Sequence, residues 1–435
     1  MKILYLDSSY LSFDFPQTTV HDKLDVIDPF KSLNEASKYL DVNLSFDLIL
    51  YNPYVFINLI DNPDFNLEYF LSNISVKCIP YSNPKDLLPL SRKIENELIA
   101  LFPPSMNSKI LDINHNYENK CVLVTGAGGS IGSELVIQLL QSGVKKCLCL
   151  DLSEFSIFNL KQKLNELKYD NFKIIVGDCG DTELLDSIFL AHNVDIIVNA
   201  SAYKHVSIMQ ENPYAALNNN VLSFLQLLKT AHKYGVYDII HVSTDKAADP
   251  SNVMGFSKLL CEQILINANS YLGSSFKYSI VRFGNVVGSS GSVVPIFIDN
   301  IKNGKKLYIT DDQVERYMMQ INDAVSLILR AAIKRENQTY ILDMGSPYKI
   351  KDLAKKMIQN CFFYFDSKLI KFSGLQEGEK VSEILFTANE AAKMKKLDGV
   401  FVIKNHDDSL LKKSEMKLLF SGSINFLFKK IKDFK

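Results

Sequence analysis

Three adjacent residues, Thr244, Asp245 and Lys246, place a hydroxyl, a carboxylate and an ammonium group side by side. Thr244 is the last residue of the run DIIHVST (238–244), whose composition predicts a buried strand, and Asp245 and Lys246 follow it. An acid and a base can coexist near neutral pH when each stabilises the other and burial shifts their pKa values. The triplet therefore indicates acid–base chemistry at a strand end, with an ordinary surface ion pair as the alternative.

A glycine-rich segment joins the apolar run CVLVT to the amphipathic run SELVIQLLQSG. Gly126 allows a tight turn, and Gly129 lets the backbone N–H groups of Ser130 and Ile131 approach a pyrophosphate at a helix N-terminus. Gly132 allows the helix to pack closely on the preceding strand. This placement between a strand and a helix predicts a dinucleotide site rather than a plain glycine turn.

Asp151 closes the next apolar run, about 20 residues after the glycines, where a ribose-binding acid is expected. Its carboxylate can accept both hydroxyls of an adenosine ribose and would repel a 2′-phosphate, which favours NAD over NADP. The alternative is a solvated acid at a strand end. Asp178, next to Cys179, is placed to meet the adenine, and Ala200 and Ala202 are small enough to leave room for the cofactor.

These residues lie at the ends of predicted strands that alternate with helical segments. The predicted strands are 121–126, 146–152, 173–178, 194–201, 238–244 and 278–286. Such alternation is typical of a doubly wound parallel sheet, in which ligands bind beyond the carboxyl ends of the strands. We expect an α/β protein with an NAD-binding Rossmann domain at 118–290, followed by a smaller nucleotide-sugar-binding lobe and C-terminal helices at 291–435.

Residues 1–117 predict a separate small α/β domain whose role is left open. Strands are expected at 2–6, 47–51 and 75–81, and helices at 32–40 and 84–102. The first strand runs into DSSYLS, which contains no glycine. A phosphate-binding loop is therefore not expected in this part of the chain.

Composition and charge argue against several classes of protein. The 435 residues carry 48 basic and 49 acidic side chains, a balance that argues against binding nucleic acid by bulk electrostatics. Seven scattered cysteines without a C-x-x-C pair argue against a disulfide framework or a zinc site, and favour a reducing cytoplasm. No apolar run approaches the roughly 18–20 residues of a membrane span, and no secretory signal is evident.

Residues 121–386 resemble the nucleotide-sugar branch of the extended short-chain dehydrogenase/reductases. The similarity is carried by VTGAGGSIGSEL, LDLSE, SAYKHVSIMQENP, STDKAADPSNVMGFSK, VRFGNVVGSSGSVVPIF, ERYMM, ILDMGSP and GLQEGEK. More narrowly, the chain is similar to the UDP-N-acetylglucosamine 4,6-dehydratases of capsule and protein-glycosylation pathways. Epimerases of the superfamily usually place small hydroxyl residues where this chain has Asp245 and Lys246, which favours a dehydratase.

The resemblance implies NAD-dependent removal of water from C5 and C6 of UDP-N-acetylglucosamine. Oxidation at C4 makes the C5 proton acidic, and the hydride taken from C4 returns to C6. Asp245 is implied as the acid at O6, Lys246 as the base at C5, and Thr244 as a hydrogen-bond partner of the C4 hydroxyl. Lys258 is implied as the contact of the nicotinamide ribose.

Met254 stands where most of the superfamily has the Tyr of Tyr-x-x-x-Lys. A thioether cannot exchange protons near neutral pH, so the acceptor of the C4 hydroxyl proton is left open between Asp245 and an ordered water. A subset of the dehydratases has Met at this place. Because members that invert C5 usually keep the Tyr, Met254 favours retention at C5.

The resemblance also implies a set of substrate contacts. They are Lys204 and His205 in the crevice, Asn285 and Arg316 at the diphosphate, Val293 beside the uracil, and Glu379 at the uridine ribose. For His205, a packed structural histidine is an equal alternative. Gln376 replaces the Arg that the family has in this loop, which removes one positive partner for the diphosphate.

Three further expectations concern partners and competing functions. The chain is expected to form a homo-oligomer, by analogy with the superfamily. Its last stretch, SEMKLLFSGSINFLFKKIKDFK, is expected to pack on the core, with contact to an anionic membrane surface as the alternative. Competing functions are a sugar-nucleotide epimerase, a dehydratase that inverts C5, and a non-catalytic module that binds NAD and a UDP-sugar.

Overall fold

The computed structural model describes residues 3–6, 24–27, 48–51, 78–80 and 114–431, with gaps at 303–304, 334–335, 363–368, 398 and 405–410. The chain divides into two compact units. One contains residues 1–98, 297–307 and 354–370, and the other contains residues 99–296, 308–353 and 371–435. Each unit is described by itself.

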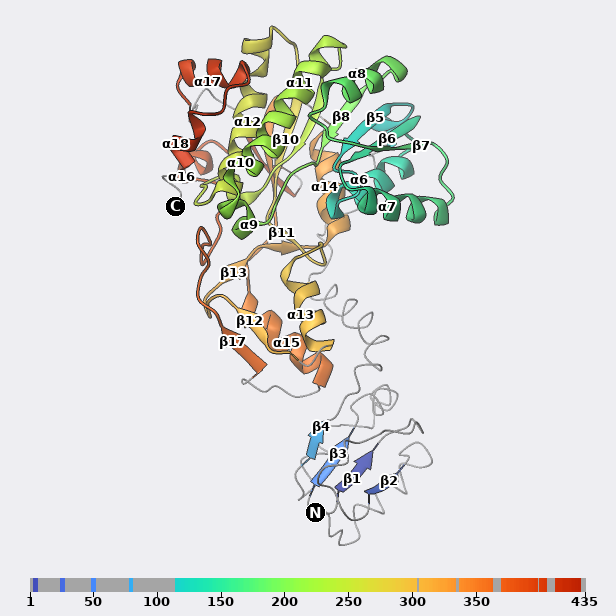
Figure 1. Cartoon of the computed structure of the whole chain (residues 1–435), viewed down its shortest axis with the longest axis vertical. Helices are drawn as coiled ribbons and strands as arrows, with labels where there is room; N and C mark the ends of the chain where they lie inside the picture. Colours follow the sequence, from blue (N-terminus) through green and yellow to red (C-terminus); the bar gives the residue numbers. More distant parts are fainter. Residues whose placement is uncertain are drawn as a thin grey trace. The chain divides into compact units, whose positions relative to one another are not determined.

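The larger unit is built around a sheet to which nine of the described strands contribute (Figure 1). In chain order they are β5 (Cys121–Thr125), β6 (Lys146–Asp151), β7 (Phe172–Val176), β8 (Ile196–Asn199), β9 (Asp238–Val242), β10 (Lys277–Arg282), β15 (Gln338–Leu342), β18 (Lys395–Leu397) and β19 (Val400–Lys404). Their order across the sheet is β18-β19-β15-β10-β9-β8-β5-β6-β7. The seven strands from β15 to β7 in this order pair in parallel, whereas β19 is antiparallel to both of its neighbours, β15 and β18. This confirms the predicted doubly wound α/β fold.

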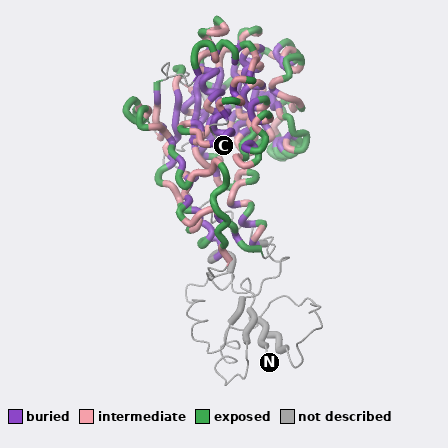
Figure 2. The backbone as a smooth tube through the Cα atoms, turned by 60° about the vertical axis from the view of Figure 1, so that its left-hand side comes forward, coloured by how far each residue is buried: buried purple, intermediate pink, exposed green. Residues whose placement is uncertain are grey.

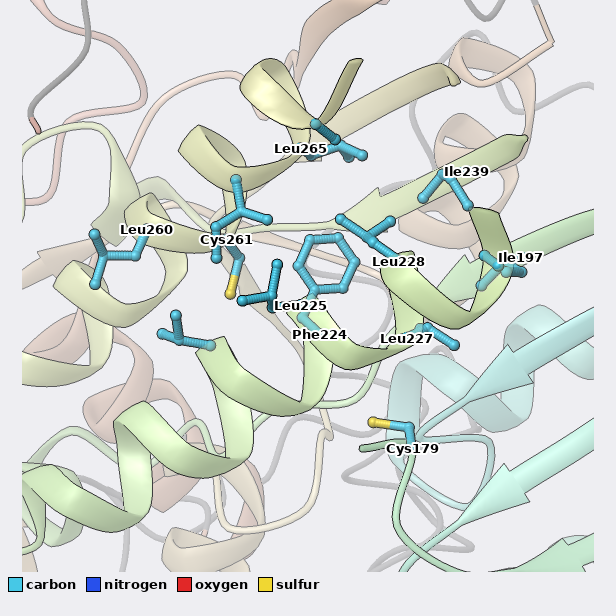
Figure 3. Close-up of a cluster of buried hydrophobic side chains, with 14 of the residues drawn as sticks. Cys179, Ile197, Phe224, Leu225, Leu227, Leu228, Ile239, Leu260, Cys261 and Leu265 are labelled. Carbon is cyan, nitrogen blue, oxygen red and sulfur yellow. The ribbon is translucent and has the colours of Figure 1, made fainter. Parts of the chain in front are cut away.

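Helices cover both faces of this sheet. One face carries α6 (Ser130–Gln141), α7 (Glu154–Glu166) and α14 (Ile321–Ala331), and the other carries α8 (Thr182–Ala191), α11 (Ser223–Lys233) and α12 (Val253–Leu272). Alternate residues of each strand point to opposite faces, so Leu123 joins one buried cluster while Val122 and Val124 join the other. Figure 3 shows the cluster under α11 and α12, and Figure 2 shows buried residues concentrated in the sheet. Burial on both faces explains the near-continuous apolar strands.

The sheet differs from the sequence-based prediction at two places. It takes β15, β18 and β19 from beyond residue 290, where only a loose pattern of short elements is expected. The predicted strand 278–286 is divided into β10 and β11 (Asn285–Val286), and β11 pairs with β14 (Met318–Met319) instead of extending the sheet. At the break, a Cβ on Gly284 would lie 2.9 Å from the Tyr317 side chain. Glycine therefore permits the close approach of these two segments at the break. The domain boundaries at 117 and 290 stay predictions.

The remaining elements are shorter. They are α5 (Asn114–Tyr117), α9 (Val206–Glu211), α10 (Pro213–Ala216), the π-helical turn η3 (Leu217–Leu222), the 3-10 turn η4 (Asp245–Ala247), α13 (Val293–Lys302), β12 (Leu307–Ile309), β13 (Glu315–Arg316), β16 (Tyr348–Lys349), α15 (Ile350–Phe362), β17 (Ile370–Phe372), α16 (Ala388–Ala391), α17 (Lys413–Phe420) and α18 (Leu427–Ile431). Of these, β13 pairs with β16 in an antiparallel ladder.

The N-terminal unit contains a parallel sheet of four described strands in the order β2-β1-β3-β4. Three of them, β1 (Ile3–Leu6), β3 (Leu48–Tyr51) and β4 (Cys78–Pro80), lie within predicted strands. The fourth, β2 (Leu24–Ile27), is not predicted, because LDVI is short and its neighbours are polar. The helices predicted at 32–40 and 84–102 lie outside the described residues.

The C-terminal helices α17 and α18 pack on the larger unit. Leu419, Leu427 and Ile431 are buried in the same cluster as α12, and the ring of Phe420 stacks on Tyr271 with centroids 4.8 Å apart. Most apolar residues of this segment, up to residue 431, therefore pack in the protein's own core, and Leu418 is exposed. Within the described ranges, no helix has the length and apolar character needed to cross a membrane.

Candidate active site

The sequence motifs meet at the carboxyl ends of β5, β8 and β9. The chain order reverses between β5 and β8, which is where open α/β sheets hold their ligands. The glycine loop follows β5, the segment 200–205 follows β8, and Thr244-Asp245-Lys246 follows β9. Sequence spacing alone does not bring these three segments together, whereas adjacent parallel strands do.

The glycine loop has the close contacts that the motif requires. Gly126 has φ of +65°, which a side chain rarely adopts, and a Cβ on it would lie 2.8 Å from the Ala200 backbone oxygen. A Cβ on Gly132 would lie 1.9 Å from the Gly126 oxygen. Gly129 is the N-cap of α6 and provides no side-chain hydrogen bond to the helix. Because glycine has no side chain to cap the helix, the first N–H groups of α6, at Ser130 and Ile131, can bind an anion.

The predicted adenosine contacts lie beside this loop. Asp151 Oδ2 accepts a hydrogen bond from Gly128 N at 2.8 Å, and its Oδ1 accepts one from Ser153 N at 2.8 Å. The acid therefore holds the glycine loop and keeps further lone pairs for ribose hydroxyls. Asp178 Oδ1 accepts from Gly180 N at 2.7 Å. Cys179 is buried, and burial raises the pKa of its thiol to about 11.

These observations fit a dinucleotide. An NAD site needs a tight glycine turn, an uncapped helix N-terminus and a carboxylate at the end of the second strand. Gly126 and Gly132, the start of α6 and Asp151 at the end of β6 provide these three parts. Ala200 and Ala202, at the end of β8, are partly exposed beside the glycine loop.

The acid–base triplet is tightly arranged. Asp245 is 1% exposed, and its Oδ1 accepts from Thr244 Oγ1 at 2.9 Å and from Lys246 Nζ at 3.1 Å. Lys246 Nζ also lies 3.7 Å from Glu383 Oε1. The ammonium thus lies between two carboxylates, one before and one after it in the chain. The alternative of an ordinary surface ion pair is excluded, because Asp245 and Glu383 are both buried.

One oxygen of Asp245 has no hydrogen-bond partner among the described residues. Its Oδ2 is buried, and a Cβ on Gly284 would lie 3.1 Å from it. An unsatisfied buried oxygen costs free energy, about 1–3 kcal/mol, unless a donor or a proton reaches it. This oxygen is therefore a place where the carboxyl group can take up a proton.

Met254 and Lys258 lie one turn apart on α12. Both side chains are 5% exposed, and Met254 is part of the apolar cluster on that face of the sheet. Lys258 Nζ donates to the Val242 oxygen at 2.7 Å and lies 3.3 Å from His241 Nε2. Burial lowers the pKa of Lys258. Asn252 begins the helix by accepting from Gly255 N at 2.8 Å.

The segment after β8 contacts the loop after β11. Lys204 Nζ donates to the Ser290 oxygen at 2.8 Å. The ring of His205 packs against Gly291, since a Cβ on Gly291 would lie only 2.5 Å from Cε1 of His205. Burial lowers the pKa of Lys204, and burial followed by the Lys204 charge lowers the pKa of His205. Both side chains are thus placed against the loop that leads to Val293, the first residue of α13.

The predicted diphosphate and ribose contacts divide into two groups. Asn285 Oδ1, in β11, is buried without a hydrogen-bond partner among the described residues. Arg316, in β13, donates from Nη2 to Glu379 Oε1 at 3.0 Å, so two predicted substrate contacts pair with each other. Gln376 N donates to Glu379 Oε2 at 3.2 Å. Lys380, which could have replaced the missing Arg, is bound to Asp249 with Nζ 2.6 Å from Oδ2.

Sequence reasoning missed two residues that the fold brings to this site. Glu383 comes three residues after the GLQEGEK motif, and only its distance to Lys246 reveals it. His241 lies inside a predicted strand, where a single polar residue is read as part of the strand pattern. For Glu383 the sequence offers a weak signal, because it is the one acid in the largely apolar segment VSEIL.

Comparison with known proteins places these residues in a family. The model of a family described as polysaccharide biosynthesis protein matches residues 122–405. The capsular polysaccharide biosynthesis protein CapD of Staphylococcus aureus is 36% identical over 304 residues, which are 69% of this chain and 50% of that protein. The match thus spans half the length of that relative. A protein named UDP-glucose 4-epimerase, of Rickettsia rickettsii, is 35% identical over 285 residues, 64% of this chain and 80% of its own.

Solved structures agree with the fold. The structure of Pen from Bacillus thuringiensis matches with a TM-score of 0.62 and 30% identity, over 71% of this chain and 99% of that one. DesIV, a dTDP-glucose 4,6-dehydratase of Streptomyces venezuelae solved with NAD, matches with a TM-score of 0.54 and 19% identity, over 70% and 98%. The range matched by the family model, 122–405, contains both the glycine loop and the Asp245–Lys246 pair. The chain belongs to the polysaccharide biosynthesis protein family.

Proposed function

We propose that the chain is an NAD-dependent nucleotide-sugar 4,6-dehydratase, acting on UDP-N-acetylglucosamine. The observation that carries the proposal is the arrangement of Asp245. One oxygen of its buried carboxyl group is occupied by Thr244 and Lys246, and the other has no partner among the described residues. Elimination of water needs an acid and a base on one edge of the sugar, and Asp245 and Lys246 are such a pair.

The residues divide the proton transfers among themselves. Bound NAD supplies the hydride acceptor for C4 and the hydride donor for C6. Asp245 takes up the proton of the C4 hydroxyl as the hydride leaves C4, and it delivers that proton to O6 as water leaves. Lys246, as a neutral amine, removes the proton from C5. Thr244 holds the C4 hydroxyl. Lys246 then returns its proton to C5. Asp245 ends as the carboxylate that it was at the start and Lys246 ends as the neutral amine, so protons balance over one turnover.

Two side chains bear on the outcome at C5. Met254 cannot exchange a proton, and its side chain is buried in the apolar cluster. In this proposal the proton returned to C5 comes from Lys246, the group that removed it, and therefore to the same face of the sugar. We infer retention at C5.

A second candidate is a sugar-nucleotide 4-epimerase, because relatives with 32–35% identity carry the name UDP-glucose 4-epimerase. An epimerase needs no acid at O6 and no base at C5. The Asp245–Lys246–Glu383 arrangement therefore favours the dehydratase.

Incubation with UDP-N-acetylglucosamine in deuterated water, followed by mass spectrometry and proton NMR, tests the proposal. We expect a product that has lost one water and carries deuterium at C5, with the C5 coupling of the original configuration. A C4 epimer without deuterium would support the second candidate instead. Unchanged substrate in the presence of bound NAD would support a non-catalytic binding module.

Two substitutions test the roles of the pair. Asp245→Asn keeps the shape but cannot deliver a proton, and Lys246→Met removes the amine. We expect both to lower turnover at least about a hundredfold, the usual scale of losing a general acid or base. Lys380→Met, which removes a lysine paired elsewhere, is the control. Turnover near that of the unsubstituted protein in either variant would contradict the assignment.

A further inference from the structure

A chain of four buried polar side chains runs beneath the carboxyl ends of the sheet. Thr125 Oγ1 lies 2.6 Å from Asn199 Oδ1, and Asn199 Nδ2 lies 3.0 Å from His241 Nδ1. On the other side of the imidazole, Nε2 lies 3.3 Å from Lys258 Nζ. All four residues are at most 5% exposed. The chain links the last residue before the glycine loop to the lysine proposed to contact the nicotinamide ribose.

The surroundings of Lys258 leave its charge weakly compensated. The titratable groups that act on it are His241 on β9, and Cys261 and Glu262 on its own helix. Glu262 is already bound by Arg282 on β10, with Nη2 2.6 Å from Oε2. The neighbouring turn η3 contributes no ionisable side chain. Burial lowers the pKa of Lys258, and it lowers the pKa of His241 well below its ordinary value.

Proton counting limits how this chain can be hydrogen-bonded. A neutral imidazole has one N–H group and one acceptor nitrogen. When Lys258 is an ammonium group, it donates to both the Val242 oxygen and His241 Nε2. The ring proton must then be on Nδ1, which needs an acceptor, so the Asn199 amide must present its oxygen to the ring and its nitrogen to Thr125.

When Lys258 is a neutral amine, the whole chain reverses. The amine donates to the Val242 oxygen and accepts from His241 Nε2–H. Nδ1 then accepts from the Asn199 amide nitrogen, and the amide oxygen accepts from the Thr125 hydroxyl. A change of histidine tautomer moves only a proton, and reversal of the amide exchanges the positions of its oxygen and nitrogen. Each charge state of Lys258 thus has one matching tautomer of His241.

We propose that His241 is a positioning residue that holds Lys258 and couples its charge state to the hydrogen bonds of Asn199 and Thr125 at the glycine loop. Packing alone does not require a histidine here. The ring of Phe224 lies on His241 with centroids 4.5 Å apart, and a phenylalanine would satisfy that contact. The two ring nitrogens, by contrast, each face a polar group. The consequence for the cofactor depends on the proposed contact of Lys258 with NAD.

The first test is NMR of the full chain with ¹⁵N-labelled histidine, between about pH 5.5 and 9.5. His241 is identified by the loss of its signals in His241→Gln. We expect a ring that stays neutral throughout, with the proton on Nδ1 at the acidic end, because the ammonium group occupies Nε2. In Lys258→Met, which removes that donor, the proton should move to Nε2. A ring that takes up a second proton, or a tautomer unaffected by Lys258→Met, overturns the proposal.

The second test measures NAD affinity against pH by calorimetry. His241→Phe keeps the contact with Phe224 but leaves the ammonium group with one acceptor fewer, which favours the neutral amine. We expect NAD affinity to fall as Lys258 loses its proton at alkaline pH. In His241→Phe this fall should begin at least one pH unit lower than in the unsubstituted protein, with NAD binding about tenfold weaker at pH 8. His241→Gln, which restores an acceptor, should recover most of this shift.

Phe224→Leu is the matched control, because it removes the ring contact and leaves both nitrogens in place. It should lower the melting temperature without moving the pH profile. An equal loss of affinity at every pH in His241→Phe would reduce the residue to a packing role and overturn the proposal. Neither test uses a sugar nucleotide, so failure of the proposed dehydration leaves both results interpretable.

Discussion

Arg316 Nη2 donates to Glu379 Oε1 at 3.0 Å, although 63 residues separate them. The same guanidinium group donates from Nη1 to the backbone oxygens of Glu315 and Val381. Glu379 Oε1 also accepts from Thr310 Oγ1 at 2.9 Å. The pair therefore joins the loop 374–380 to β13. The Arg316 side chain is 9% exposed and that of Glu379 is 21% exposed, so solvent reaches little of the contact.

Replacing Arg316 by Lys should weaken nucleotide-sugar binding. A lysine keeps the charge but loses the planar fork that satisfies Glu379 and two backbone oxygens together. We expect KM for the nucleotide sugar to rise about tenfold, with NAD affinity unchanged. Steady-state kinetics of Arg316→Lys, Glu379→Gln and the double variant test this. Strictly additive effects would show that the two side chains act independently.

Replacing Glu383 by Gln should slow turnover. The buried carboxylate lies 3.7 Å from Lys246 Nζ and helps to hold that amine beside Asp245. We expect kcat to fall about tenfold, equivalent to about 1.4 kcal/mol, with little change in melting temperature. Glu377→Gln, at an exposed position of the same segment, is the control. Equal rates for the two variants would remove Glu383 from the site.

Two glycines of the loop should respond differently to alanine. A Cβ on Gly132 would lie 1.9 Å from the Gly126 oxygen, so Gly132→Ala should lower stability by about 2 kcal/mol or more. A Cβ on Gly129 would approach that oxygen only to 3.2 Å, at a φ of −70° that alanine adopts. Gly129→Ala should therefore keep the melting temperature and weaken NAD binding. Thermal unfolding and NAD titration of both variants separate the two effects.

Asp151 should determine the choice between NAD and NADP. Its carboxylate would repel a 2′-phosphate, and its Oδ2 also accepts from Gly128 N. Asp151→Ser removes the charge and keeps a small hydrogen-bonding group. We expect NAD to bind about tenfold more weakly, while the NADP-to-NAD affinity ratio rises. An unchanged ratio would show that the carboxylate does not contact the ribose.

The buried thiols should make stability fall at high pH. Burial raises the pKa of Cys179 to about 11 and that of Cys261 to about 12, from 9.0. Because the folded-state values are raised, the stability contributed by the neutral thiols is fully present below about pH 9. It is lost as pH rises toward 12, since the unfolded chain ionises first. Residue-resolved alkylation should leave both cysteines unmodified at pH 8 until denaturant is added. Prompt labelling of either would contradict the burial.

The doubly wound sheet could be predicted from the residues alone, and the acid–base chemistry proposed at its edge also rests on local sequence patterns. Apolar strands that alternate with amphipathic helices have few other ways to bury both faces of a sheet. The glycine loop, Asp151 and Thr244-Asp245-Lys246 are local signals, because each function is expressed within a few consecutive residues. Parallel strands then require their carboxyl ends to meet, which predicts one common site.

The contacts that join distant segments follow from the folded arrangement and could not be predicted. Glu383 reaches Lys246, and Glu379 reaches Arg316, through the return of the chain after residue 370. His241 meets Asn199 and Lys258 because β8, β9 and α12 pack together. No local pattern encodes these pairs, since each depends on which strand lies beside which and on how far a side chain extends. Likewise, the break between β10 and β11 lies where Gly284 approaches Tyr317, which is a contact across the fold.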